Sequence, residues 1–99
     1  MRDLISGAMA YEAYRQWTLV QDDLAEPARK VGVIDALIAA LPRLNEVQEA
    51  AHKIIAHAPE SDGARVLGEM LALSGEEVTR QPGFREQLIR ERDALAGAS

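Results

Sequence analysis

Two polar side chains, Glu49 and His52, stand where a helix could present them together as metal ligands. Their three-residue spacing places both on one face of a helix, as in the Glu-x-x-His pairs that hold metals inside helical bundles. A two-metal site of that kind needs a second pair and two further carboxylates from facing helices, and the sequence holds a single pair. We therefore expect no metal site, with both side chains on the solvated side of an amphipathic helix.

Residues suited to nucleophilic catalysis are also sparse. His52 and His57 are five positions apart, about 140° around a helix, so they cannot serve one site from a shared face. No serine stands in a nucleophile elbow, and no glycines have the spacing of a phosphate-binding loop. We expect a protein that is not an enzyme and that uses no cofactor.

In the segment from 64 to 81, Gly68 is a small residue where two helices would approach, and Ser74 stands at a turn between them. This segment resembles the core of a helix-turn-helix motif. The resemblance implies that the helix after the turn enters the major groove, where Ser74, Thr79 and Arg80 would face DNA. A purely structural helical corner needs the same small and apolar positions. DNA binding through this segment is therefore the alternative function.

Composition narrows the class of protein further. The 99 residues are enough for a single helical domain spanning 1–99. Hydrophobic residues make up 47% of the chain and aromatic residues only 4%, which favours closely packed helices over strands. The net charge of −5 repels nucleic-acid phosphates. Because cysteine is absent and no apolar run is long enough to cross a bilayer, we expect a cytoplasmic protein without a membrane role.

Proline and capping residues divide the sequence into helices. The segment from about 3 to 24 predicts a long first helix, and the segment from about 28 to 41 predicts a central helix that is apolar on nearly every side. Proline disfavours helical geometry in the residue before it, so we expect this helix to end just before Pro42. A third helix would begin at Asn45, with Gln48 completing its cap.

The remaining helices follow from further capping residues. Ser61 or Asp62 would open a fourth helix, Ser74 with Glu77 would open a short fifth, and a last helix would span about 83 to 95. We therefore expect an all-α protein, a compact bundle of five to six helices around the central apolar helix at about 28–41.

The first helix carries more apolar surface than one small domain is expected to cover. A seam at spacings of three and four is formed by Ala10, Ala13, Trp17, Val20 and Leu24. Leu4, Tyr11 and Tyr14 lie off this seam, and Tyr and Trp are common at protein interfaces. We expect an interaction module that binds a protein partner through Leu4, Tyr11, Tyr14 and Trp17, as a homo-oligomer or as an adaptor or subunit of a larger assembly. The alternative for the tyrosines is packing against the C-terminal helix.

Overall fold

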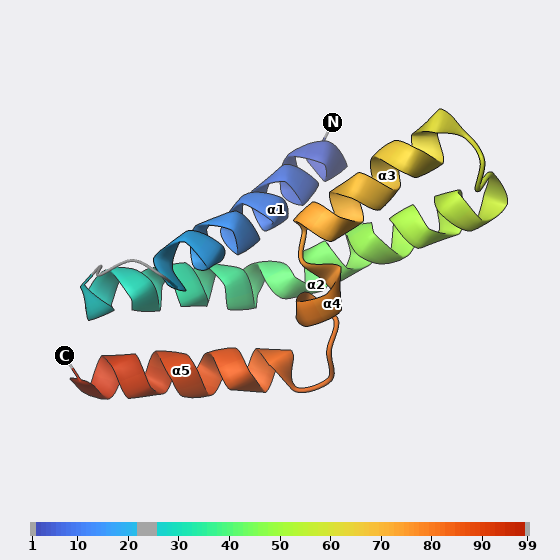
Figure 1. Ribbon diagram of the computed structural model, residues 1–99. Helices are drawn as coiled ribbons and strands as arrows, with labels where there is room; N and C mark the ends of the chain where they lie inside the picture. Colours follow the sequence, from blue (N-terminus) through green and yellow to red (C-terminus); the bar gives the residue numbers. More distant parts are fainter. Residues whose placement is uncertain (1, 22–25, 99) are drawn as a thin grey trace.

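The chain folds into helices. The computed structural model describes the backbone of residues 2–21 and 26–98 and the side chains of residues 7–21 and 26–97. This part of the chain contains five helices and no strand: α1 (Arg2–Gln21), α2 (Pro27–His57), α3 (Asp62–Leu73), α4 (Glu76–Thr79) and α5 (Phe84–Ala98) (Figure 1). The expected all-α class is confirmed. Leu4 and Leu24 lie outside the residues whose side chains are described.

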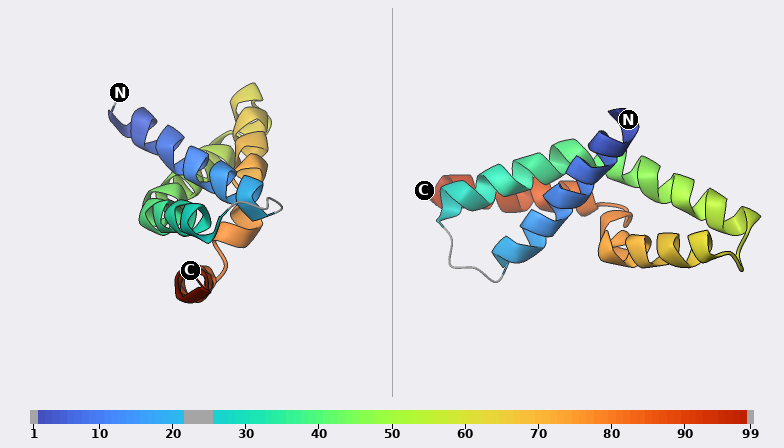
Figure 2. Two further views of the ribbon diagram at one scale, coloured as in Figure 1. Left: turned by 90° about the vertical axis from the view of Figure 1, so that its left-hand side faces the viewer. Right: turned by 90° about the horizontal axis from the view of Figure 1, so that it is seen from above.

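The helix α2 is the axis of the molecule. All four other helices pack on it, with α1 and α3 on one side and α5 on the other (Figures 1 and 2). At a rise of about 1.5 Å per residue, its 31 residues nearly span the longest dimension of 49 Å. The radius of gyration is 14.9 Å, above the value of about 13 Å for a compact domain of this length. The expected central helix is confirmed, in a more elongated bundle.

The helix break expected before Pro42 is wrong. Pro42 lies midway along α2, where it removes the backbone N–H that would bond to the carbonyl of Ile38. Such a residue costs a helix about 3 kcal/mol. Here Pro42 faces solvent while its neighbours Leu41 and Leu44 are 4% and 2% exposed, so their burial holds the helix together. The helix changes direction near its middle (Figure 2), the usual response to an internal proline.

Two of the expected helix caps are also corrected. Asn45 and Gln48 lie inside α2 and open no new helix. Ser61 does cap α3, accepting a hydrogen bond of 3.1 Å from the backbone N–H of Ala64. Ser74 ends α3 and does not begin the next helix, which follows Gly75.

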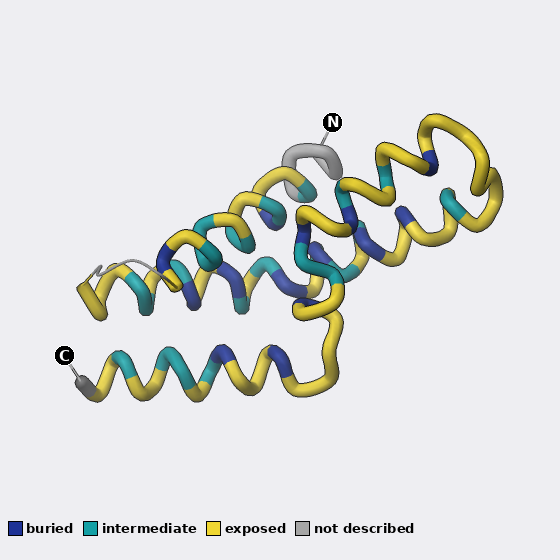
Figure 3. Tube along the Cα trace, in the orientation of Figure 1, coloured by how far each residue is buried: buried dark blue, intermediate teal, exposed yellow. Residues whose placement is uncertain are grey.

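The core lies where α1, α2 and α5 meet, and the buried positions of α2 face these neighbours (Figure 3). Its buried members are Ala10, Ile34, Leu37, Leu41, Leu44, Phe84 and Leu88. Trp17 reaches from α1 to α5, where its ring meets the edge of Phe84 with centroids 5.5 Å apart. Ala36 and Ala39 stay exposed, so α2 is covered on some of its faces and not on all of them.

Candidate functional site

An open groove lies between α1 and α3, with α2 as its floor. The two wall helices each pack on α2 but, across the described ranges, not on each other. Viewed along the molecule they diverge from α2 like the arms of a V (Figure 2, left). The groove encloses about 660 Å³, within the roughly 300–1,000 Å³ typical of binding pockets. We call it the α1–α3 groove.

The lining of the α1–α3 groove is mainly apolar and comes from all three helices. It consists of Gly7, Ala8, Tyr11 and Glu12 from α1, Leu44, Val47 and Gln48 from α2, Val66, Glu69, Met70 and Leu73 from α3, and Ser74 directly after α3. Leu73 is 64% exposed and Val66 is 53% exposed. Large apolar side chains that stay exposed beside a groove are typical of a binding surface.

A buried hydrogen-bond network lies at the floor of the groove around Gln48. The amide nitrogen Nε2 donates to Ser74 Oγ and to Thr79 Oγ1, each at 3.0 Å. The two hydroxyls donate their own protons to the carbonyls of Leu71 at 2.9 Å and Gly75 at 3.1 Å. Because each hydroxyl donates elsewhere, each has to accept from Gln48. The network therefore fixes the amide with its nitrogen toward Ser74 and Thr79.

In this arrangement the amide oxygen of Gln48, Oε1, receives no hydrogen bond from the network. The residue is 0% exposed, and Oε1 has no hydrogen-bond partner within the described part of the chain. A buried acceptor without a partner costs about 1–3 kcal/mol. Gln48 is among the residues that line the α1–α3 groove, and Oε1 is the acceptor of this side chain that has no donor in the described part of the chain.

The position of α1 relative to the end of α3 is fixed by a contact between Tyr14 and Gly75. Gly75 has a φ of +66°, and a Cβ built there would lie 2.1 Å from both Cζ and Oη of Tyr14. Glycine is needed both for the left-handed backbone and for the close approach of the phenol. The contact therefore holds the two walls of the groove at a set separation.

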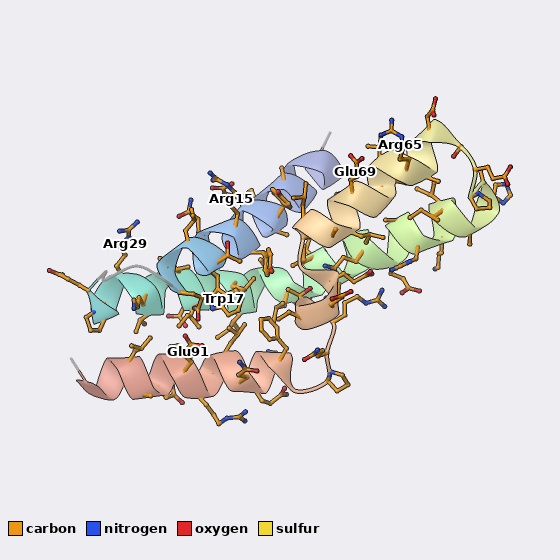
Figure 4. The ribbon with its side chains drawn as sticks, viewed as in Figure 1. Arg15, Trp17, Arg29, Arg65, Glu69 and Glu91 are labelled. Carbon is orange, nitrogen blue, oxygen red and sulfur yellow. The ribbon has the colours of Figure 1, made fainter. Side chains whose placement is uncertain are left out.

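Two carboxylates stand at the mouth of the groove. Glu12 accepts hydrogen bonds from Gln16 at 2.8 Å and from Arg15 at 3.0 Å, and the bond from Gln16 is the main reason that the pKa of Glu12 is lowered. Glu69 pairs with Arg65 at 3.3 Å. Arg15, Arg65 and Glu69 point outward from their helices (Figure 4). Such exposed pairs contribute little to stability, so both carboxylates can exchange partners.

The residues expected to bind a partner divide between the groove and the protein interior. Tyr11 lines the α1–α3 groove. Tyr14 and Trp17 are half-buried and pack against the core, with their ring centroids 5.9 Å apart, and Trp17 points from α1 toward α5 (Figure 4). The side chain of Leu4 is not among those described. A role of these residues in binding a partner stays a prediction.

The residues expected to face DNA are placed differently by the structure. Ser74 and Thr79 are 2% and 3% exposed, with both hydroxyls used in the network around Gln48. Their burial does not support a contact with DNA, and DNA binding through this segment stays a prediction. Arg80 is exposed, but its guanidinium pairs with Glu49 at 2.8 Å and with Glu76 at 3.5 Å.

Glu49 and His52 both lie on the exposed side of α2, as expected. Glu49 pairs with Arg80, and the Nε2 of His52 contacts the carboxylate of Glu76 on α4. Across the described ranges, no group of three or more possible ligands is close enough to hold a metal ion.

The sequence interpretation missed the groove residues Gln48, Val66 and Leu73. For Gln48 a signal was present, because the buried positions Leu41, Leu44, Gln48 and Ala51 repeat at spacings of three and four. A polar residue on such a seam predicts a buried amide. The break assumed at Pro42 hid the seam by assigning its members to two separate helices. For Val66 and Leu73 no sequence signal distinguishes a groove residue from a core residue, because apolar residues on a helix such as α3 are equally typical of both.

The chain matches no protein-family model, no curated protein and no solved structure. Among the described residues, no helix has the length and apolar character needed to span a membrane. The groove geometry is therefore the basis for assigning a function.

Proposed function

We propose that this protein is a non-enzymatic interaction module that binds a helix of another protein in the α1–α3 groove, with the first helix as one wall. The observation that carries the proposal is the open apolar groove itself, flanked by exposed Leu73 and Val66. Leaving such side chains in water forgoes about 25 cal/mol per Å² of apolar surface. A partner that covers them recovers that free energy.

The residues predicted on the first helix take two roles in this proposal. Tyr11 contacts the partner directly, because it lines the groove. Tyr14 and Trp17 act indirectly by holding α1 against Gly75 and against Phe84. The proposal thus keeps the first helix as the interface and adds α3 as the second wall.

The chemistry of the groove supports binding more than catalysis. The hydroxyl of Ser74 donates to the carbonyl of Leu71, so its proton is not shared with a base. No histidine lines the groove among the described residues. A nucleophile needs an adjacent base within hydrogen-bond reach, and the lining offers none for Ser74. The absence of cysteine from the sequence supports a cytoplasmic location as part of the same proposal.

The proposal is tested with a matched pair of lysine substitutions. Leu73 and Met9 are 64% and 68% exposed, so Leu73→Lys and Met9→Lys should both leave the fold intact. Only Leu73 lines the groove, whereas Met9 lies on another face of α1. The full chain is first used to capture partners from an extract. Each identified protein is then purified and titrated by calorimetry against the unsubstituted chain, Leu73→Lys and Met9→Lys.

We expect a purified partner to bind the unsubstituted chain and Met9→Lys equally and Leu73→Lys at least about tenfold more weakly, because an ammonium group would enter the apolar contact. Equal weakening by both substitutions would exclude the groove as the site. Sedimentation equilibrium tests for self-association. A dimer that dissociates only on Leu73→Lys would overturn the assignment to a different protein.

A further inference from the structure

We infer that the partner helix inserts a tryptophan over Gln48 and flanks it with basic residues at the mouth of the α1–α3 groove. The inference rests on the proposed function and specifies the chemistry of the occupant. The observation behind it is the buried Oε1 of Gln48, which has no hydrogen-bond partner within the described part of the chain.

The shape of the groove suits a helix. Its walls are two helices that diverge from a shared third helix (Figure 2, left). A fourth helix can lie between such walls at the usual interaxial distance of about 8–10 Å. An amphipathic helix would place its apolar face on Val47, Val66 and Leu73, in the way that helices generally occupy apolar grooves.

The polar atoms of the groove call for an occupant that donates hydrogen bonds. Oε1 of Gln48 can only accept, and so can the ionised carboxylates of Glu12 and Glu69. The indole of tryptophan has a large apolar body, one N–H donor and no acceptor. A tyrosine or serine would bring an oxygen acceptor of its own into the apolar floor. Tryptophan is therefore the side chain that satisfies Oε1 without adding a new unsatisfied group.

The indole can reach Oε1 only after a small rearrangement, because Gln48 is fully buried in the unbound chain. Met70 also lines the groove, and it is half-buried and unbranched, with three rotatable bonds. A change of rotamer at an interface is common on binding, so a new rotamer of Met70 is part of the inferred complex.

Charge sets the residues that flank the tryptophan. Glu12 and Glu69 line the groove, one on each wall, and the chain carries a net charge of −5. Their present pairs with Arg15 and Arg65 are exposed and lie within single helices, so a partner cation can replace either arginine at little cost. Lysine or arginine residues on either side of the tryptophan would complete the complementarity.

A second copy of this chain lacks the required group. The chain contains one tryptophan, and Trp17 is packed against Phe84 at a centroid distance of 5.5 Å. Releasing it would dismantle the core of the donor copy. The occupant is therefore a different protein.

The test is a selection followed by a matched pair of ligands. A display library of amphipathic helical peptides, randomised on the apolar face and its flanks, is selected on the full chain and counter-selected on Leu73→Lys. We expect the selected peptides to share a central tryptophan with flanking Lys or Arg. The best peptide is then synthesised with tryptophan and with benzothienylalanine, which has sulfur in place of the indole N–H and nearly the same shape.

We expect the N–H to strengthen binding about tenfold, or about 1.4 kcal/mol, and the bound indole N–H to be protected from solvent exchange in NMR spectra. On Gln48→Met, with its fold checked by circular dichroism, the two peptides should bind equally. Equal binding of the two peptides to the unsubstituted chain, or selected peptides without tryptophan, would overturn this inference and leave the proposed function standing. A selection that yields no peptide sensitive to Leu73→Lys would instead overturn the proposed function.

Discussion

The contact between Tyr14 and Gly75 predicts that Gly75→Ala destabilises the protein by about 3–4 kcal/mol. Of this, about 1–2 kcal/mol comes from forcing a residue with a Cβ into the left-handed backbone at φ +66°. The rest comes from Tyr14, which must leave because the new Cβ would lie 2.1 Å from its ring. Its departure forfeits the ring contact with Trp17, about 0.5–1.5 kcal/mol, and the burial of part of the phenol.

A double-mutant cycle separates these two contributions. In a Tyr14→Ala background there is no ring to displace, so Gly75→Ala should cost only the backbone part, about 1–2 kcal/mol. The difference between the two backgrounds is then about 2 kcal/mol of coupling. The assay is urea denaturation followed by helical circular dichroism, with the free energy of unfolding taken from linear extrapolation.

Gly68→Ala is the matched control for this cycle. A Cβ at Gly68 would meet nothing within 4 Å, and the residue is exposed within α3. We expect it to stabilise the protein by about 0.5–1 kcal/mol, since alanine restricts the unfolded chain more than glycine does. If Gly75→Ala cost the same with and without the Tyr14 ring, the close approach between these residues would be refuted.

Three further predictions concern α1 and α2. Pro42→Ala restores a backbone donor to the carbonyl of Ile38 and should raise the free energy of unfolding by up to about 3 kcal/mol in urea denaturation. Trp17→Ala should cost about 3–5 kcal/mol, whereas Trp17→Phe should cost much less in the same assay, because the buried indole N–H has no partner in the described part of the chain. The pKa of Glu12 lies below its ordinary value of 4.5, chiefly through the hydrogen bond from Gln16. Its contribution to stability is therefore present above the unfolded pKa and lost as the pH falls through the lower folded pKa, and Gln16→Ala should raise the pKa measured by NMR titration.

The helical class and the central helix were predictable from the sequence because they depend on patterns of many residues. The central helix was predicted from the apolar character of residues 31–41 and from the proline at the start of α2. A wrong interpretation of any one residue would not have changed this prediction. The continuation of α2 past Pro42 was not predictable in the same way. It depends on the burial of Leu41 and Leu44 by helices distant in sequence, which outweighs a local preference.

The groove was harder to predict because it is made by the arrangement of helices in space. Tyr11 was identified through its residue type, which is common at interfaces. Tyr14 and Trp17 have the same types, but the turn at Gly75 and the ring of Phe84 draw them into the protein. The burial of Ser74 and Thr79 was not predictable because their partner, Gln48, lies 26 and 31 positions away along the chain. No local sequence pattern indicates a contact between residues so far apart along the chain.

The bend in α2 has a mechanical consequence for the molecule. The helix α5 packs on the part of α2 before Pro42, where Leu37 and Leu88 belong to one buried cluster. The floor residues Leu44 and Gln48 lie in the part of α2 after the bend. The angle of this bend therefore governs how far apart the groove walls α1 and α3 stand. A partner bound between α1 and α3 would contact elements on both halves of α2, so the bend would become more rigid on binding. A straight α2 would give the α1–α3 groove a different shape.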